Sequence, residues 1–217
     1  MSVGIVGGTG AQGRGLALRW GATAEVLLGS RSPQRAVRSA EELAAASGGS
    51  IRGASNREAA RTSDVVVLAL PYAARERALE ELAPALAGKI VVDMTVPLDP
   101  SRPTAVRLPR GGSAALELQA QLCGRARIVA ALHNISAARL AALAEPLRGD
   151  VLVCSDDEAA KARVIDLIDA LGLRGLDAGP LVNAIAAESL TPVLIHINRR
   201  YGGSNAGIEI VGIPAKT

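Results

Sequence analysis

Aromatic residues are nearly absent from this sequence of 217 residues. There is no phenylalanine, and the aromatic residues are Trp20, Tyr72 and Tyr201. Because apolar residues still make up 49% of the chain, the core must be built from Ala, Val, Leu and Ile. Proteins that bind RNA or single-stranded DNA stack the bases on aromatic side chains. The composition therefore predicts no nucleic-acid partner.

Cysteine, clustered charge and long apolar runs are also scarce. Cys123 and Cys154 cannot build a disulfide framework, which favours a reducing compartment, and they lack the spacing to the two histidines that a zinc site needs. The 24 basic and 21 acidic residues are interspersed, so the net charge of +3 forms no concentrated basic patch. No apolar run reaches the roughly 18 residues of a membrane span, and no secretory leader is recognisable. We expect a cytoplasmic protein with no metal and no membrane partner.

Buried apolar strands alternate with helices along most of the chain. We predict strands at residues 2–6, 25–29, 65–70, 89–93, 127–132 and 151–154, and helices at residues 10–20, 33–46, 74–87, 113–123, 137–147 and 157–171. Unbroken apolar runs such as VVVLAL at 65–70 are typical of parallel strands covered on both faces. This pattern predicts an α/β fold with a doubly wound, mostly parallel Rossmann-type sheet.

The pattern changes after Ala178. Gly179-Pro180 interrupts the chain, residues 181–201 read as one long apolar helix, and residues 202–207 are rich in glycine. We predict an NADP-binding domain over residues 1–178 and a small helical domain over residues 179–217. Pro192 cannot donate a hydrogen bond to the Glu188 carbonyl, so a kink is expected there. Such a kink would expose Ser189 and Thr191 to a ligand, although packing alone can also shape a proline kink.

A glycine-rich turn joins the first predicted strand to the first predicted helix. Its members, which match G-x-G-x-x-G, are Gly8, Thr9, Gly10, Ala11, Gln12 and Gly13. In dinucleotide-binding folds the first glycine allows the tight turn, the second lets a pyrophosphate approach the backbone, and the third allows close helix–strand packing. The strand before the turn and the helix after it supply the context that the motif requires.

The end of the second predicted strand indicates which dinucleotide binds. NAD-preferring sites usually carry an acidic residue there, which holds the ribose 2′-hydroxyl. This sequence has Ser30 and Arg31 instead, with Arg35 one turn later. A hydroxyl and two guanidinium groups bind a 2′-phosphate through charge-assisted hydrogen bonds. We therefore predict NADP, although Ser30 and Arg31 are also compatible with a polar helix start.

Other polar residues end the following strands, at the sheet edge where ligands gather in such folds. His133 follows the predicted strand 127–132, and Pro71 follows the strand 65–70. A histidine at a strand end can also serve only as a helix cap. These positions predict a second ligand beside the dinucleotide.

Five segments carry a family resemblance: GIVGGTGAQGRGLALR, GSR at 29–31, ALP at 69–71, ALHNISAARL at 131–140 and DAGPLVNAIAAESLTP at 177–192. They resemble the NADPH-dependent coenzyme F420 reductases, also called F420-dependent NADP oxidoreductases. The resemblance implies that NADP is held by residues 9–12, Ser30, Arg31 and Arg35, with Leu70, Pro71 and Ala137 on the nicotinamide side. It implies that the deazaflavin F420 rests near Ser50, His133, Ser189, Thr191 and Ala206. Asn134, Ser136 and Tyr72 depart from the family pattern.

The resemblance implies reversible hydride transfer between NADP(H) and F420, with His133 orienting the deazaflavin by a hydrogen bond or a positive charge. Two alternatives remain open from the sequence. One is an NADPH-dependent reductase of another small acceptor, namely a flavin, a ferric chelate or an imine. The other is a non-enzymatic NADP(H) sensor. The apolar segment 193–195 beyond Pro192 also predicts a homodimer.

Overall fold

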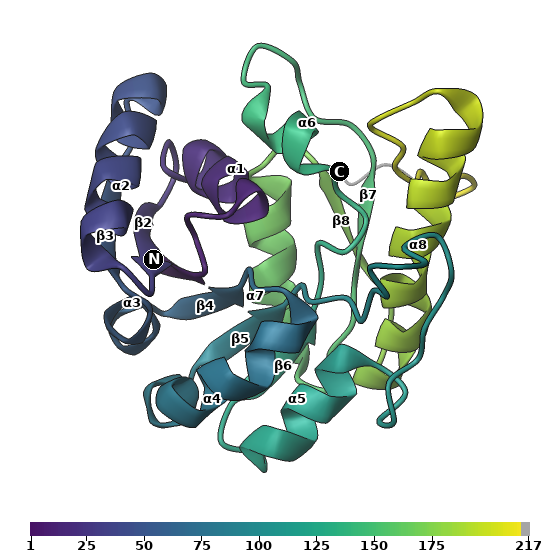
Figure 1. Ribbon diagram of the computed structural model, residues 1–217, viewed down its shortest axis with the longest axis horizontal. Helices are drawn as coiled ribbons and strands as arrows, with labels where there is room; N and C mark the ends of the chain where they lie inside the picture. Colours follow the sequence, from purple (N-terminus) through teal and green to yellow (C-terminus); the bar gives the residue numbers. More distant parts are fainter. Residues whose placement is uncertain (214–217) are drawn as a thin grey trace.

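The computed structural model describes residues 1–213 as a doubly wound α/β fold (Figure 1). Its main sheet has six parallel strands in the order β3-β2-β1-β4-β5-β6. These strands are β1 (Ser2–Val6), β2 (Glu25–Ser30), β3 (Ile51–Ser55), β4 (Val65–Leu68), β5 (Ile90–Asp93) and β6 (Arg127–Ala130). The helices are α1 (Ala11–Trp20), α2 (Pro33–Ser47), α3 (Asn56–Thr62), α4 (Tyr72–Leu86), α5 (Ala114–Leu122), α6 (Ala137–Ala141), α7 (Glu158–Asp169) and α8 (Ala184–Tyr201), the last preceded by a 3-10 turn at Leu181–Asn183. The strand order, which reverses direction next to β1, confirms the predicted fold class.

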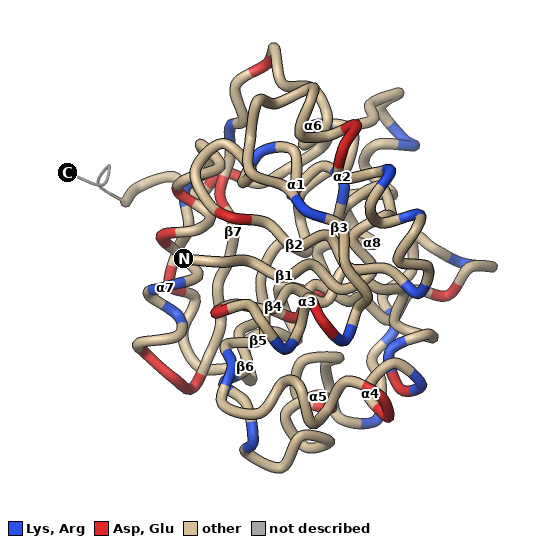
Figure 2. Tube along the Cα trace, turned by 90° about the vertical axis from the view of Figure 1, so that its left-hand side faces the viewer, with Lys and Arg blue, Asp and Glu red and all other residues tan. Residues whose placement is uncertain are grey.

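Local sequence explains several of these elements. All four residues of β4 are buried, as expected for an unbroken apolar strand in a sheet covered on both faces. Helix α2 begins after Ser32, whose hydroxyl accepts a hydrogen bond from the Arg35 backbone N–H, and Pro33 occupies the first helical position. Charged residues of both signs are interspersed along the trace (Figure 2).

The core contains one tryptophan, Trp20, at the end of α1. Only 1% of its surface is exposed, and its indole Nε1 donates a hydrogen bond of 2.8 Å to the Leu167 carbonyl of α7. The other large, fully buried side chains are aliphatic, as the composition predicted. Trp20 therefore joins α1 to α7 in the layer that covers one face of the sheet.

Three features differ from the sequence prediction. Strand β3 and helix α3 were missed, because β3 is a short edge strand whose sequence, IRGAS, is only partly buried. The predicted strand 151–154 is β7 (Asp150–Val153), which pairs with β8 (Arg174–Asp177) in a separate two-stranded sheet. An antiparallel bridge between Cys154, just after β7, and Ala130 of β6 joins this small sheet to the main one. Helix α6 ends at Ala141, well before the predicted residue 147, and Pro146 disfavours helical backbone at the residue that precedes it.

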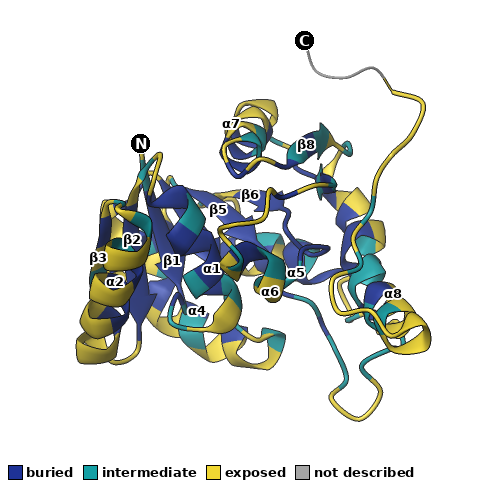
Figure 3. Cartoon of the chain, turned by 90° about the horizontal axis from the view of Figure 1, so that it is seen from above, coloured by how far each residue is buried: buried dark blue, intermediate teal, exposed yellow. Residues whose placement is uncertain are grey.

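Helix α8 lies beside the sheet, with one face buried and the other exposed (Figure 3). Leu181 and Ala184 pack in the same cluster as the apolar side chains of β4, β5 and β6. Within residues 1–213, Leu181–Tyr201 is the helical stretch whose length and hydropathy would suit a membrane span, a test that core helices also pass. The division at residue 178 stays a prediction.

Candidate functional site

The glycine turn follows β1 and is shaped by close packing. A Cβ atom at Gly13 would lie 2.5 Å from the Gly8 Cα, and one at Gly8 would lie 2.6 Å from Leu28 Cδ1. A Cβ at Gly10, by contrast, would meet only the Gly7 carbonyl oxygen, at 3.4 Å. Gly8 and Gly13 are therefore required for packing, whereas the exposed face of Gly10 is open to a ligand.

The N-terminus of α1 is available to an anion. Gly10 is its N-cap residue and makes no side-chain capping hydrogen bond, and its first turn contains no acidic residue. The free N–H groups at a helix N-terminus and the positive end of its dipole together favour phosphate binding. The turn can therefore hold the pyrophosphate that the motif predicts.

Ser30 lies beside this turn, and two arginines follow it. The hydroxyl oxygens of Thr9 and Ser30 are 3.5 Å apart, and the Ser32 backbone N–H donates to the Ser30 hydroxyl. Arg31 and Arg35 are exposed, and their guanidinium groups make no ion pair with any residue in the described part of the chain. The three side chains predicted to bind the 2′-phosphate thus lie at the carboxyl end of β2 and in the residues that follow it, through the first turn of α2.

The residues predicted to line the nicotinamide also lie near the turn. A Cβ at Gly7 would lie 2.5 Å from Leu70 Cδ2, so Leu70 covers the turn directly. Gln12 reaches the loop after β6, where its Nε2 donates a hydrogen bond of 2.9 Å to the Ile135 carbonyl. Ala137 opens helix α6 at the end of that loop, and exposed Pro71 is the N-cap of α4 next to Leu70.

His133 lies in the same loop with its ring buried. Neither ring nitrogen makes a well-formed hydrogen bond within residues 1–213, although the Asp93 backbone is close enough to interact weakly with the ring. The side-chain oxygen of Gln12 is also without a hydrogen-bonding partner in this part of the chain. Burial lowers the pKa of His133 to about 4, although the nearby Asp93 backbone offsets part of this effect. The imidazole is therefore neutral at neutral pH, which disfavours the positively charged role and leaves the hydrogen-bonding one. Buried polar atoms without partners are rare in folded proteins, so these atoms fit a polar ligand.

Helix α8 places Thr191 directly against His133. The Thr191 hydroxyl donates a hydrogen bond of 2.6 Å to the His133 carbonyl, and the Ser189 hydroxyl donates one of 2.6 Å to the Ile185 carbonyl. Both hydroxyl protons are therefore committed, and the hydroxyl oxygens remain as acceptors. The Ala206 N–H is also committed, because it donates to the Asn198 side-chain oxygen.

Ser50 does not join this site, contrary to the sequence prediction. It directly precedes β3, and its carbonyl accepts from Val26 near the start of β2. Ser50 therefore lies at the amino end of the parallel strands, whereas His133 follows the carboxyl end of β6. The prediction failed because it rested on a segment whose strand had not been recognised.

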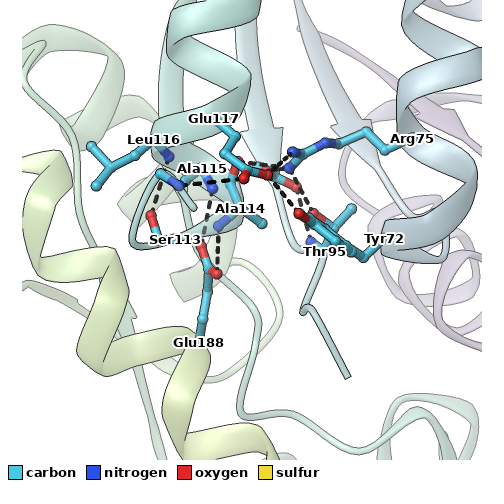
Figure 4. A network of polar contacts seen from close by, with 11 residues as sticks. Tyr72, Arg75, Thr95, Ser113, Ala114, Ala115, Leu116, Glu117 and Glu188 are labelled. Carbon is cyan, nitrogen blue, oxygen red and sulfur yellow. Dashed lines mark hydrogen bonds and ion pairs between the residues drawn. The ribbon is translucent and has the colours of Figure 1, made fainter. Parts of the chain in front are cut away.

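The sequence prediction also missed a buried network of polar side chains (Figure 4). Arg75 of α4 forms an ion pair with Asp93 at the end of β5, with 3.0 Å between nitrogen and oxygen, and a second one with Glu117 of α5. Glu188 of α8 accepts hydrogen bonds from the backbone N–H groups of Ala114 and Ala115. Glu188 is the single acidic residue within the apolar segment 181–198, and this was the signal that the sequence offered.

The glycine turn has one further anchor that sequence inspection missed. The Asn56 side-chain oxygen, at the start of α3, accepts a hydrogen bond of 3.0 Å from the Gly7 backbone N–H. Asn56 follows the unrecognised strand β3, so its position could not be read from the chain. It anchors the turn at Gly7, the residue that Leu70 also covers.

Comparison with known proteins identifies the family to which this chain belongs. Residues 2–97 match the family described as "NADP oxidoreductase coenzyme F420-dependent". The chain is 37% identical to the F420-dependent NADP reductase of Methanocaldococcus jannaschii, over 98% of this chain and 99% of that protein. It is 37% identical to the enzyme of the same name from Methanothermobacter thermautotrophicus, over 99% of this chain and 96% of that one. The chain belongs to the F420-dependent NADP reductase family.

Solved structures agree with this family membership. A crystal structure from Arthrobacter sp. FB24, described as a candidate F420-dependent NADP reductase, superposes with a TM-score of 0.83 at 27% identity. The match covers 98% of this chain and 100% of that one, so it includes α8 as well as the main sheet. The family and the fold class predicted from the sequence are thus both confirmed for this F420-dependent NADP reductase family member.

Proposed function

We propose that this chain catalyses reversible hydride transfer between NADP(H) and the deazaflavin coenzyme F420. Family membership supports the reaction, and one structural observation carries the placement of the second ring. That observation is the buried His133 imidazole, which makes no well-formed hydrogen bond in the described chain. His133 lies in the loop contacted by Gln12, and its carbonyl accepts a hydrogen bond from the Thr191 hydroxyl. A planar heterocycle with hydrogen-bonding edges would satisfy it.

NADP would be held at one side of this edge. The N-terminus of α1 would bind the pyrophosphate, with the backbone of Gly10 open to it. Ser30, Arg31 and Arg35 would bind the 2′-phosphate, because guanidinium groups pair with phosphate through charge-assisted hydrogen bonds. Leu70 and Ala137 would bound the nicotinamide.

The chemistry of hydride transfer is supplied by the two cofactors when both are bound. The chain's own residues would position the rings and exclude water between them. Holding two reactants in a productive arrangement can lower a barrier by about 7–11 kcal/mol. His133 and Thr191 would orient the deazaflavin, with the neutral imidazole donating from one nitrogen and accepting at the other.

Assembly and location form a finer part of the proposal. We propose a homodimer that buries the exposed side of α8, where Val193 is 42% and Ile197 is 37% exposed. The opposite side of α8 packs on the protein core, and this supports a cytoplasmic enzyme without a membrane partner. Sedimentation at several protein concentrations would test the dimer, with a Val193→Glu variant expected to be monomeric.

Rapid mixing of NADPH with F420 tests the function directly. We expect fast loss of F420 absorbance and fluorescence, and much slower reduction of FMN, a ferric chelate or a cyclic imine. Faster reduction of one of those acceptors would favour the alternative reductase. Tight NADPH binding with no turnover of any acceptor would favour the sensor.

A further inference from the structure

Glu188 connects the C-terminal helix to the main body through the first turn of α5. Its two carboxylate oxygens accept hydrogen bonds of 2.7 Å and 3.1 Å from the Ala114 and Ala115 N–H groups. Ser113 caps the next N–H, that of Leu116, at 3.1 Å. A side chain from α8 therefore satisfies two of the free N–H groups of α5 (Figure 4).

The same turn of α5 is held from its other side by Arg75. The guanidinium group donates a hydrogen bond of 2.6 Å to the Ala114 carbonyl, and it also reaches Asp93 and Thr95 at the end of β5. Arg75 is 2% exposed and Glu188 is 3% exposed, so water does not weaken these contacts. The peptide unit between Ala114 and Ala115 accepts from Arg75 at its carbonyl and donates to Glu188 at its N–H. It thus links α8 rigidly to the ligand-facing end of β5.

Two residues predicted to contact the deazaflavin follow Glu188 on the same helix. Ser189 follows it directly, and Thr191 lies almost one turn later, bonded to the His133 carbonyl. A shift of Glu188 along or around the helix axis would therefore displace both hydroxyl groups relative to His133. The nucleotide turn is contacted by other residues and would not move.

We propose that Glu188 is a positioning residue: by binding the first turn of α5, it fixes α8 so that Ser189 and Thr191 meet the deazaflavin at the correct distance from NADP. This role rests on the proposed function. Both carboxylate oxygens of Glu188 are already engaged by the N–H groups of α5, so the proposed role needs no direct contact with either substrate. Its effect passes through helix position alone.

The charges around Glu188 give the role a pH signature. The titratable or charged groups near it are Arg75, Asp93, Arg107, Glu117 and Cys154. Burial raises the pKa of Glu188 to about 7, and the two backbone N–H groups offset this only in part. Because the folded pKa lies above the ordinary value of 4.5, protonation of Glu188 favours the folded arrangement, and this contribution is complete below the ordinary value and is lost as the pH rises toward about 7. Docking of α8 should weaken as the pH rises through about 7 and the carboxyl ionises.

Three variants of the full chain test the proposal: Glu188→Ala, Glu188→Gln and Ser113→Ala. The last is the matched control, because it removes a cap from the same turn of α5 and leaves the contact with α8 intact. F420 affinity is measured by fluorescence titration, NADPH affinity by calorimetry, and the mobility of α8 by hydrogen exchange of peptides covering residues 184–195.

We expect Glu188→Ala to raise the Kd for F420 about tenfold, to leave the Kd for NADPH within about twofold, and to speed exchange in α8. Glu188→Gln should recover part of the F420 affinity and abolish the wild-type inflection in F420 Kd near pH 7. Equal weakening of both ligands, an unchanged pH profile in Glu188→Gln, or the same F420 effect in Ser113→Ala would overturn the proposal. If Glu188→Ala does not fold, the pH profile and the Gln variant decide. Wild-type protein that binds no F420 would refute the proposed function and, with it, this inference.

Discussion

Of two glycine substitutions in the nucleotide turn, one should mainly lower stability and the other should mainly weaken nucleotide binding. In Gly13→Ala the new methyl group would lie 2.5 Å from the Gly8 Cα and 2.7 Å from the Gly8 carbonyl oxygen. These contacts are with backbone atoms of Gly8, so no side-chain rotation can relieve them. In Gly10→Ala the nearest atom is the Gly7 carbonyl oxygen at 3.4 Å, and the backbone angles of φ −75° and ψ 166° suit alanine.

The magnitudes follow from these contacts. Overpacking of a close contact costs about 1–3 kcal/mol, and three backbone contacts under 3 Å place Gly13→Ala in the upper half of that range. For a chain of this size, a loss of about 2 kcal/mol lowers Tm by about 4–8 °C. Gly10→Ala loses only part of an N-cap preference, about 0.5 kcal/mol, so its Tm should fall by about 1–2 °C.

Binding should follow a different order from stability. A methyl group at Gly10 occupies the face that a pyrophosphate would approach, so the Kd for NADPH should rise at least about tenfold. Thermal unfolding without ligand and calorimetric titration with NADPH measure the two effects separately. A Gly10→Ala variant that binds NADPH as the wild type does would show that the phosphates lie elsewhere, whatever its Tm.

Three further perturbations probe the site and its support. Arg31→Ala should weaken NADPH by about 10–100-fold and leave NADH unchanged, because a charge-assisted hydrogen bond contributes about 1.5–3 kcal/mol; equal loss for both nucleotides would exclude a 2′-phosphate contact. The pKa of His133, about 4 in the folded chain, lies below its ordinary value of 6.5, so its stabilising contribution is complete above that ordinary value and is lost as the pH falls toward 4. In His133→Asn, the free energy of unfolding measured with urea should therefore no longer fall as the pH is lowered between these two pKa values, a fall of up to about 3 kcal/mol in the wild type. If the variant loses stability with acid as the wild type does, the ring is solvated. Arg75→Met should cost about 3–5 kcal/mol in urea unfolding, because it leaves buried Asp93 and partly buried Glu117 without their counter-ion; a loss below about 1 kcal/mol would show that the carboxyls are protonated at no cost.

The parts of the fold that depend on local signals could be predicted. The first strand, the glycine turn and α1 follow from an apolar run and glycine spacing, and α2 follows from the cap at Ser32. Strand β3 could not be recognised because its five residues form a partly exposed edge strand, with too little apolar character to stand out. The pairing of β7 with β8 was equally hidden, since an apolar strand does not specify its partner sheet.

Some residues of the candidate site could likewise be predicted from the sequence, and others could not. Residues at the carboxyl ends of β1, β2, β4 and β6 could be predicted because parallel strands bring those ends to one edge. Ser50 was wrong because the strand that it precedes was not recognised. Glu188 was missed as a contact because its partners lie 73 and 74 residues away in the chain. A lone acid in an apolar helix indicates that a partner exists, but sequence cannot say which.

Trp20 gives the protein a useful optical property. It is the one indole in the chain, it is fixed by its hydrogen bond to α7, and it sits at the opposite end of α1 from the nucleotide turn. Ten helical residues separate the two by about 15 Å. Emission from this indole should therefore report the loss of the α1–α7 junction when the ligand-free protein unfolds.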